Sequence, residues 1–355
     1  MKFTALPVNV GDSFLLRTEN KVVLVDGGMN KLHILKLLRK EKITNNHIDL
    51  LICTHYDADH INGIIGILKS QKYSFTELWL PEILGSIGYT LSKKIGEIFG
   101  DLRNNDVHID DSVFNQYDSE EMSEESTCNN SFEKIDNEVL RNISKTFLNQ
   151  HNELFWYFNN VYPTSQYKMM SSAKSVASLV SNSLSSGAYI RWFKYKDREI
   201  HKTYGFNMYC ENGIQTDITI FDTRLLFLAL YEISLSKINK CSLVYMHRKS
   251  EVPDILFTAD SDLGFYQNQV VLKDNSIVTS PHHGSSANDM AYPKISGTEL
   301  TYVRSDRSQQ SRPGKGYLIN KNRFCTICRN FTQKQKVEFV FNGTLFTTNA
   351  RVCKC

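Results

Sequence analysis

The sequence predicts an α/β layered fold interrupted by a largely helical insertion. Three observations support this fold class. Strand-like apolar segments alternate with amphipathic helices over residues 1–81, strand-like segments return after about residue 215, and metal-ligand side chains follow three of the apolar strands. Strands that alternate with helices are typical of a sheet covered by helices.

The first 81 residues contain the clearest alternation. Short runs rich in Val, Ile, Leu and Phe, bounded by turn residues, predict strands. Apolar residues at helical spacing predict two amphipathic helices between them. The expected strands are residues 2–8, 12–18, 21–28, 47–54 and 75–81, and the expected helices are residues 32–43 and 61–71.

Residues 82–205 are expected to form an insertion, largely helical, in one catalytic domain that spans residues 1–320. Within it, the acidic polar run at 117–131 has low hydrophobicity and predicts a mobile loop. Residues 321–355 form a separate basic segment that contains cysteines. Further strands are expected at 218–223, 241–247, 254–260, 276–284, 299–305, 336–342 and 345–349.

The composition narrows the class of protein. Hydrophobic residues make up 41% and charged residues 22%, which is typical of a globular chain. No apolar run reaches the roughly 18 residues of a membrane span, and the first residues lack the features of a signal peptide. Of the eight cysteines only the last four are clustered, which argues against a secreted disulfide framework. We therefore expect a cytoplasmic protein.

The charge is unevenly distributed, although the net charge is only +3. Residues 101–128 carry nine acidic side chains against one arginine, whereas residues 301–355 carry eleven Lys and Arg against two acidic side chains. A basic C-terminal segment can neutralise phosphates, which favours a nucleic-acid substrate. The alternative is an ordinary solvated face.

The stretch THYDADHING at 54–63 concentrates metal-binding side chains at the end of an apolar strand. It contains His55, Asp57, Asp59 and His60, and imidazole and carboxylate groups suit zinc, manganese or iron. The alternative is a polar turn whose aspartates cap the following helix.

Two further strand ends carry similar residues. Asp260 ends the strand at 254–260, and His282 and His283 follow the strand that begins at residue 276. Coincidence explains one such strand end more easily than three. The sequence therefore predicts a metal site on one rim of a sheet.

The pattern H-x-D-x-D-H, followed by a lone Asp and a late His, resembles the metallo-β-lactamase fold. This resemblance implies an αββα sandwich with two metals at the sheet edge. The usual first motif of the family is H-x-H-x-D-H, and here Asp57 replaces the second histidine. With GDSFLL at 11–16, NKCSLV at 239–244 and PHHGS at 281–285, the chain resembles the ComEC-type subgroup of DNA-uptake proteins, and similar domains occur in phage-defence proteins.

The resemblance implies a role for each matching residue. His55 and Asp57 match ligands of the first metal, Asp59 and His60 match ligands of the second, and Asp260 matches the bridging carboxylate. Asp59 is also expected to be catalytic.

The last histidine of the motif is assigned between two neighbours. We assign His282 as the ligand and His283 as a catalytic proton donor, although either histidine fits either role. The family's middle histidine has no counterpart, because Asn239 occupies its expected place. Asp26 is expected to support a ligand from behind; the alternative is that the sequence DGG only forms a tight turn.

The expected chemistry is hydrolysis by a water that two divalent metals, Zn²⁺ or Mn²⁺, activate. Ser285, Arg304 and Arg312 are the expected substrate-binding residues, and Arg307 lies in the same basic loop. Arginines suit the anionic oxygens of a phosphodiester; the alternative is that they form surface ion pairs. We expect a nuclease, and an effector of a defence system is one role that such a nuclease could have.

Two other functions are weighed against a nuclease. One keeps the site but hydrolyses a small phosphodiester or a lactone, and the other is a degenerate binding domain, against which the intact ligand set argues. A partner protein could bind through the insertion.

The cysteine tail predicts a second metal site of a different kind. A C-x-x-C pair and a C-x-C pair supply the four thiolates of a closed zinc site. Asn342-Gly343 is a strong turn signal, and a hairpin at this point would bring the two pairs together. The alternatives are four unliganded thiols or a disulfide. The expected ligands are Cys325, Cys328, Cys353 and Cys355.

Overall fold

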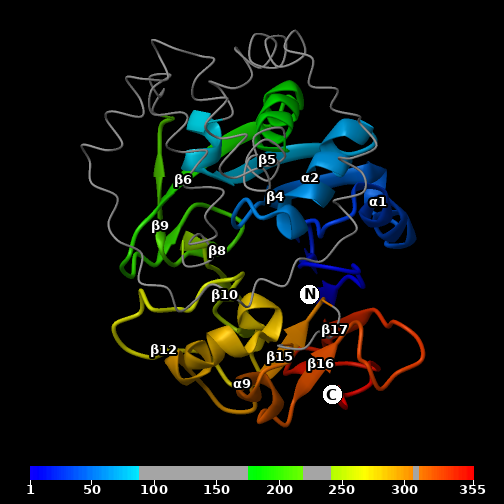
Figure 1. The fold of residues 1–355 in the computed structure, drawn as a ribbon, viewed down its shortest axis with the longest axis vertical. Helices are drawn as coiled ribbons and strands as arrows, with labels where there is room; N and C mark the ends of the chain where they lie inside the picture. Colours follow the sequence, from blue (N-terminus) through cyan, green and yellow to red (C-terminus); the bar gives the residue numbers. More distant parts are fainter. Residues whose placement is uncertain (88–174, 219–240, 307–311) are drawn as a thin grey trace, which may run out of the picture.

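The structure is a computed structural model that describes residues 1–87, 175–218, 241–306 and 312–355 (Figure 1). Most of the expected insertion lies outside the described residues, and so do the acidic loop at 117–131, Asn239 and Arg307. The described residues form two large mixed sheets and a small third one. None of the described helices is long and apolar enough to cross a lipid bilayer.

The first sheet has nine strands within the described residues. In pairing order they are β18 (Phe346–Thr347), β17 (Val337–Phe341), β1 (Lys2–Ala5), β2 (Phe14–Arg17), β3 (Val22–Val25), β4 (His47–Ile52), β5 (Ser74–Pro81), β6 (Tyr189–Tyr195) and β9 (Gly213–Thr216).

The second sheet has seven strands and includes the C-terminal part of the chain. In pairing order they are β16 (Arg323–Cys325), β15 (Thr301–Arg304), β13 (Ile277–Thr279), β11 (Val252–Phe257), β10 (Tyr245–Lys249), β8 (Met208–Cys210) and β7 (Lys202–Thr203). The two-stranded sheet pairs β12 (Val270–Val271) with β14 (Ile295–Ser296).

Helices cover the outer faces of both sheets. Helices α1 (Lys31–Lys40) and α2 (Ala58–Ser70) pack on the first sheet. The 3-10 helix η5 (Ser286–Lys294) and the short α9 (Lys315–Leu318) pack on the second sheet. The described residues also include the 3-10 segments η1 (Thr44–Asn46) and η4 (Pro281–Gly284).

Three apolar layers show the order of these elements. In β3, Val23 and Val25 face the layer between the two sheets, whereas Leu24 faces α1 and α2, as the two-residue period of a strand requires. Phe3 of β1 lies 6.1 Å, ring centre to ring centre, from Phe257 of β11, which joins the sheets through that middle layer. The αββα sandwich expected from the sequence is confirmed.

The observed end of the insertion differs from the expected boundary at residue 205. Strand β6 pairs in parallel with β5, so the first sheet has resumed by Tyr189. Its sequence YIRWFKY contains β-branched and aromatic residues, which favour strands and which the sequence analysis assigned to the insertion. Helix does occur in the described flanks of the insertion, at residues 82–87 and 175–185.

The C-terminal segment is built into both sheets. Strand β16 extends the second sheet beside β15, and β17 pairs antiparallel with β1 at the start of the chain. Figure 1 shows β17 close to the N-terminus. The expected hairpin is present, because β17 and β18 pair antiparallel around Asn342 and Gly343. Residues 321–355 therefore share the core of the domain from which the sequence analysis separated them.

Candidate metal centre

The turn from β4 into α2 presents the first group of predicted ligands. His55 lies in this turn and is buried, while Asp59 and His60 are in the first turn of α2. Asp57 occupies the N-cap position, but its side chain makes no capping hydrogen bond. Its carboxylate instead lies 3.8 Å from His55 Nε2, so helix capping does not explain this residue.

Asp26 holds this turn from behind. Its carboxylate accepts hydrogen bonds from the backbone N–H and the hydroxyl of Thr54, at 2.9 and 2.7 Å. His60 Nδ1 lies 2.9 Å from Asp26 Oδ2, so the Nδ1 proton faces the carboxylate and Nε2 is left toward the centre. Asp26 is thus placed as a support for a ligand.

Gly27, directly after Asp26, and Gly63 of α2 allow this helix to approach the end of β3. A Cβ atom on Gly27 would lie 2.4 Å from the backbone nitrogen of Ile64, and one on Gly63 would lie 1.9 Å from the Gly27 carbonyl oxygen. Such overlaps exclude any side chain. The DGG sequence therefore sets the position of the ligand-bearing helix and is more than a tight turn.

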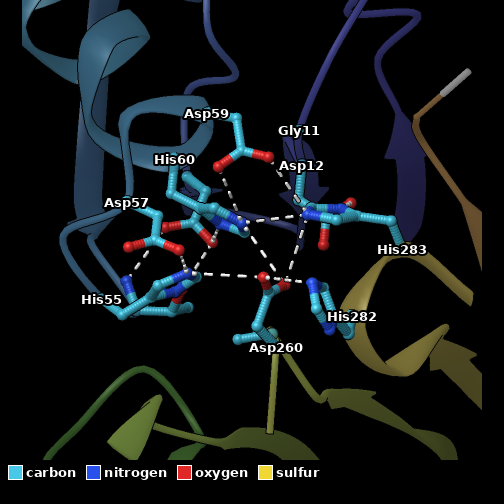
Figure 2. A network of polar contacts seen from close by, with 12 residues as sticks. Gly11, Asp12, His55, Asp57, Asp59, His60, Asp260, His282 and His283 are labelled. Carbon is cyan, nitrogen blue, oxygen red and sulfur yellow. Dashed lines mark hydrogen bonds and ion pairs between the residues drawn. The ribbon is translucent and has the colours of Figure 1, made fainter. Parts of the chain in front are cut away.

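Asp260 lies between the imidazoles, as Figure 2 shows. Its Oδ1 is 3.4 Å from Nε2 of both His60 and His283. Its Oδ2 is 3.6 Å from Nε2 of both His55 and His282. The carboxylate is 2% exposed. Each carboxylate oxygen therefore faces a different group of imidazoles, which is the arrangement expected of a bridging carboxylate.

The structure separates the roles of the two neighbouring histidines. His283 is fully buried, and its Nε2 lies 3.3 Å from Asp59 Oδ2 and 3.4 Å from His60 Nε2. Its Nδ1 lies 3.0 Å from Asp12 Oδ1. His283 thus has the surroundings of a ligand and not the solvent access of a proton donor.

His282 points to a different set of groups. Its Nδ1 is 3.1 Å from Asn288 Oδ1, and its Nε2 is 3.1 Å from Arg312 Nη2. Since the guanidinium can only donate, Nε2 of His282 is the acceptor. These contacts favour His283 over the assigned His282 as the ligand.

Asp12 is a site residue that the sequence analysis missed. It is 1% exposed, and its Oδ1 accepts a hydrogen bond from Ser305 Oγ at 2.9 Å besides contacting His283. The signal was its place in GDSFLL, between the first two strands. Nothing local in that segment identifies its partner, because 271 positions separate Asp12 from His283.

Two groups of side chains fit metal ions. Asp12, His60, Asp260 and His283 offer ligand atoms within 4.8 Å of one another, and so do His55, Asp57 and Asp260. His55 Nε2 and Asp260 Oδ1 are buried without a hydrogen-bond partner among the described residues. Buried polar atoms in a native protein need a partner, and nitrogen and carboxylate donors at such a site suit divalent cations.

The electrostatics of the centre favour positive charge. Burial lowers the pKa of His60, but the carboxylates around it, Asp260 first, outweigh burial and raise that pKa well above its usual value. Burial raises the pKa of Asp260, but the histidines, His283 first, outweigh it and hold that pKa well below its usual value. Buried carboxylates in this number stabilise any cation placed among them.

The three predicted substrate-binding residues lie in different places. Arg304 is 1% exposed and donates from Nε to the carbonyl oxygen of His283 at 2.6 Å, so it supports the chain behind the centre. Ser285 is buried at the start of η5, where its hydroxyl accepts from the Ala287 N–H. Only Arg312 contacts the cluster through a side chain, at His282.

The four tail cysteines form a third group. The Sγ atoms of Cys325, Cys328, Cys353 and Cys355 lie within 4.8 Å of one another. The hairpin of β17 and β18 returns the chain and brings the two cysteine pairs together, as the sequence predicted.

Comparisons with known proteins cover a small part of the chain. Residues 6–76 match the Metallo-beta-lactamase superfamily. Two proteins from strains of Streptococcus pneumoniae, both called exodeoxyribonuclease WalJ, are 38% identical over 63 residues, which is 18% of this chain. The chain spans 23% of the length of these relatives.

One solved structure is similar over a comparable length. The crystal structure of the short form of human tRNase Z matches 23% of this chain and 34% of its own, with 23% sequence identity and a TM-score of 0.20.

Proposed function

We propose that this protein is a metal-dependent phosphodiesterase that hydrolyses nucleic acid at the centre around Asp260. The observation that carries the proposal is the position of this carboxylate, with one oxygen toward His60 and His283 and the other toward His55. Such an arrangement suits two divalent cations held side by side. The match of residues 6–76 to the Metallo-beta-lactamase superfamily supports a hydrolase.

The residues divide into two ligand groups. His55 and Asp57 would hold the first cation, and His60 and His283 the second, with Asp260 between them. Asp59 would join the second group, because its Oδ2 lies 3.3 Å from His283 Nε2. When bound, two such cations lower the pKa of a water and stabilise negative charge on the attacking and leaving oxygens of a phosphodiester.

The protein's own groups prepare the ligands for this role. Asp26 and Asp12 contact Nδ1 of His60 and His283, which orients both rings with Nε2 toward the centre. Arg304 holds the backbone carbonyl of His283, so the second ring is fixed from two sides. The ligands are thus placed before substrate binds.

Arg312 is proposed to bind a phosphate oxygen. Its Nη1 pairs with Asp306 at 2.8 Å, and its Nη2 donates to Nε2 of His282. His282 is therefore a positioning residue that directs the guanidinium toward the centre. The side chain of His282 is 13% exposed, in contrast to that of His283, which agrees with a place on the substrate side.

Two observations favour nucleic acid among phosphodiesters. Exposed basic side chains are numerous in the described part of the C-terminal segment: Lys315, Lys321, Arg329, Lys334, Lys336, Arg351 and Lys354. The relatives matched over 63 residues are exodeoxyribonucleases by name. The ComEC-type resemblance and a role in phage defence belong to the same proposal.

The test is a substrate panel run with purified protein and added Mn²⁺ or Zn²⁺. Single-stranded DNA, duplex DNA, RNA, a small chromogenic phosphodiester and a lactone are compared, with the Asp260→Ala variant as the blank. We expect cleavage of a nucleic acid that is lost in the variant. If only the small phosphodiester or the lactone is hydrolysed, the protein is a small-molecule hydrolase and not a nuclease. If no substrate is hydrolysed in a metal-dependent way, the proposal is refuted.

A further inference from the structure

The four tail cysteines meet at a place where two distant parts of the chain are already held together. Cys325 ends β16, Cys328 follows three residues later, and Cys353 and Cys355 come from the last three residues of this sequence. Cys325, Cys328 and Cys353 are buried, and Cys355 is half-buried. Every pair of their Sγ atoms lies within 4.8 Å.

The sulfur positions fit one shared ion better than disulfides. Cys328 Sγ and Cys355 Sγ are 3.4 Å apart, well beyond the bond length of about 2.05 Å. A tetrahedral zinc with Zn–S bonds of about 2.3 Å separates its sulfurs by about 3.8 Å. Four sulfurs that all lie within 4.8 Å of one another suit that geometry, whereas disulfides would join them two by two.

Backbone hydrogen bonds prepare the group. Cys353 N–H donates to the Arg323 carbonyl at 2.8 Å, so the end of the chain lies along β16. The Gln335 side chain donates to the carbonyls of Cys325 and Arg351, at 3.0 and 2.9 Å, and accepts from the Arg351 N–H. The two cysteine pairs are therefore aligned by contacts independent of the thiols, as a preformed site requires.

We propose that Cys325, Cys328, Cys353 and Cys355 bind a structural Zn²⁺ as four thiolates, and that this ion fixes the strand end behind His283. Four protein ligands complete the tetrahedral shell of zinc and exclude a water, so the ion is structural and not catalytic. The zinc site does not depend on the proposed nuclease activity.

Two hydrogen-bonded routes connect this group to the catalytic cluster. Thr326, between the first two cysteines, donates to the carbonyls of Arg304 and Ser305, at 3.0 and 2.6 Å. Arg304 holds the His283 carbonyl, and Ser305 Oγ donates to Asp12, which contacts His283 Nδ1. Loss of the zinc would therefore loosen the support of His283 by both routes.

The proposal is tested by counting metal in chains whose catalytic centre is disabled. In the Asp260→Ala background we expect one zinc per chain by elemental analysis. Adding Cys325→Ser and Cys328→Ser should reduce this to less than 0.1 zinc, whereas Cys241→Ser, which removes an exposed cysteine outside the group, should leave it unchanged. Equal zinc in the two cysteine variants would overturn the proposal.

Cobalt substitution covers the case in which the double variant fails to fold. The otherwise unchanged protein loaded with Co²⁺ should show the intense visible and near-ultraviolet bands of a tetrahedral cobalt–thiolate centre. Cys355→Ser, which alters a half-buried ligand at the end of the sequence, should weaken these bands while the fold is kept. Absence of thiolate bands, or disulfides among these four cysteines in anaerobically purified protein, would refute the zinc site.

Discussion

The His/Asp centre and the four-cysteine group differ in how each is assembled, although both gather metal-type ligands. The first takes its ligands from the turn before α2 and the first turn of α2, from the loop after β11 and from η4, and so it bridges the two sheets. The second uses one loop after β16 and the end of the sequence. In the first group the ligand Asp57 and the neighbouring His282 are partly exposed, at 28 and 13% of their side chains, which the proposed substrate access requires, whereas four thiolates would complete the shell of a zinc ion.

The two groups also differ in the contacts that hold their ligands in place. Catalysis needs rings held at fixed angles, and the imidazoles of His60 and His283 each have a buried carboxylate behind them. The cysteines are aligned through their backbone, because the Gln335 side chain donates to the carbonyls of Cys325 and Arg351 and the Cys353 N–H donates to the Arg323 carbonyl. The imidazole rings are thus held by contacts to the rings themselves, and the cysteines by contacts to the chain that carries them.

Removing the bridging carboxylate should give the largest difference between the two groups, with activity lost at one and metal retained at the other. In Asp260→Ala we expect activity to fall below detection, because two cations without a shared anion repel each other at roughly 3.5–4 Å. The zinc of the cysteine group should remain. Metal content and turnover are measured together, with Asp262→Ala on the same loop as the control. Activity in Asp260→Ala equal to that of the unchanged protein would place the chemistry elsewhere.

Chelation should remove metal from the two groups in sequence. Asp57, Asp59 and His282 are partly exposed, at 28, 17 and 13% of their side chains, so a competing chelator can reach the His/Asp centre. We expect EDTA to abolish activity while about one zinc per chain is retained, and Mn²⁺ or Zn²⁺ to restore activity. The time courses of metal loss and activity are compared; loss of the thiolate-bound metal first would contradict the comparison.

Much of the fold and half of the centre could be read from the sequence because the signals are local. His55, Asp57, Asp59 and His60 lie within six residues, and the strand before them is a continuous apolar run. The α/β layered class also followed from alternating segments, and the resemblance to the metallo-β-lactamase fold implied the αββα order. Strand β6 was missed, because its aromatic and charged residues resemble those of the helical stretches around it.

The remaining features depend on contacts that no local pattern encodes. Asp12 and Ser305 bond across 293 positions. His282 and His283 both adopt positive φ angles, 46° and 54°, and this turn decides which ring enters the centre. A stretch with two adjacent histidines cannot reveal that choice. Arg304 was expected to bind substrate, yet the fold buries it behind His283.

The carboxylates behind the rings should give the next effect in size. Asp26→Asn and Asp12→Asn keep the shape of the side chain but remove the charge that orients the imidazole. We expect metal affinity at the His/Asp centre to fall by about 10–100-fold in each, as for other groups behind metal ligands. Affinity is measured by titrating metal-free protein and reading recovered activity.

Asp49→Asn provides the matched control for these two variants. Asp49 is a buried carboxylate of the first sheet, but it accepts from Lys21 and the Val22 N–H instead of a ligand. Its loss should alter stability and leave metal affinity unchanged. An equal fall in metal affinity in all three variants would show that general loosening, and not ring orientation, is responsible.

The smallest effects should come from changes to Arg312 and Arg304. They test whether the His/Asp centre, unlike the cysteine group, is open to an anionic substrate. Arg312→Lys keeps a positive charge but loses the planar fork that contacts both Asp306 and His282. We expect KM for a nucleic-acid substrate to rise about tenfold, as for the loss of one charged hydrogen bond, with little change in kcat.

Arg304→Lys should act differently, because Arg304 contacts the His283 carbonyl and the ring of Tyr317 in the interior. Its effect should appear as lower kcat and lower Tm with KM nearly unchanged. Steady-state kinetics of both variants distinguish these roles. A rise in KM confined to Arg304→Lys would contradict the proposal that Arg312 contacts the substrate, and would place the substrate on the other side of η4.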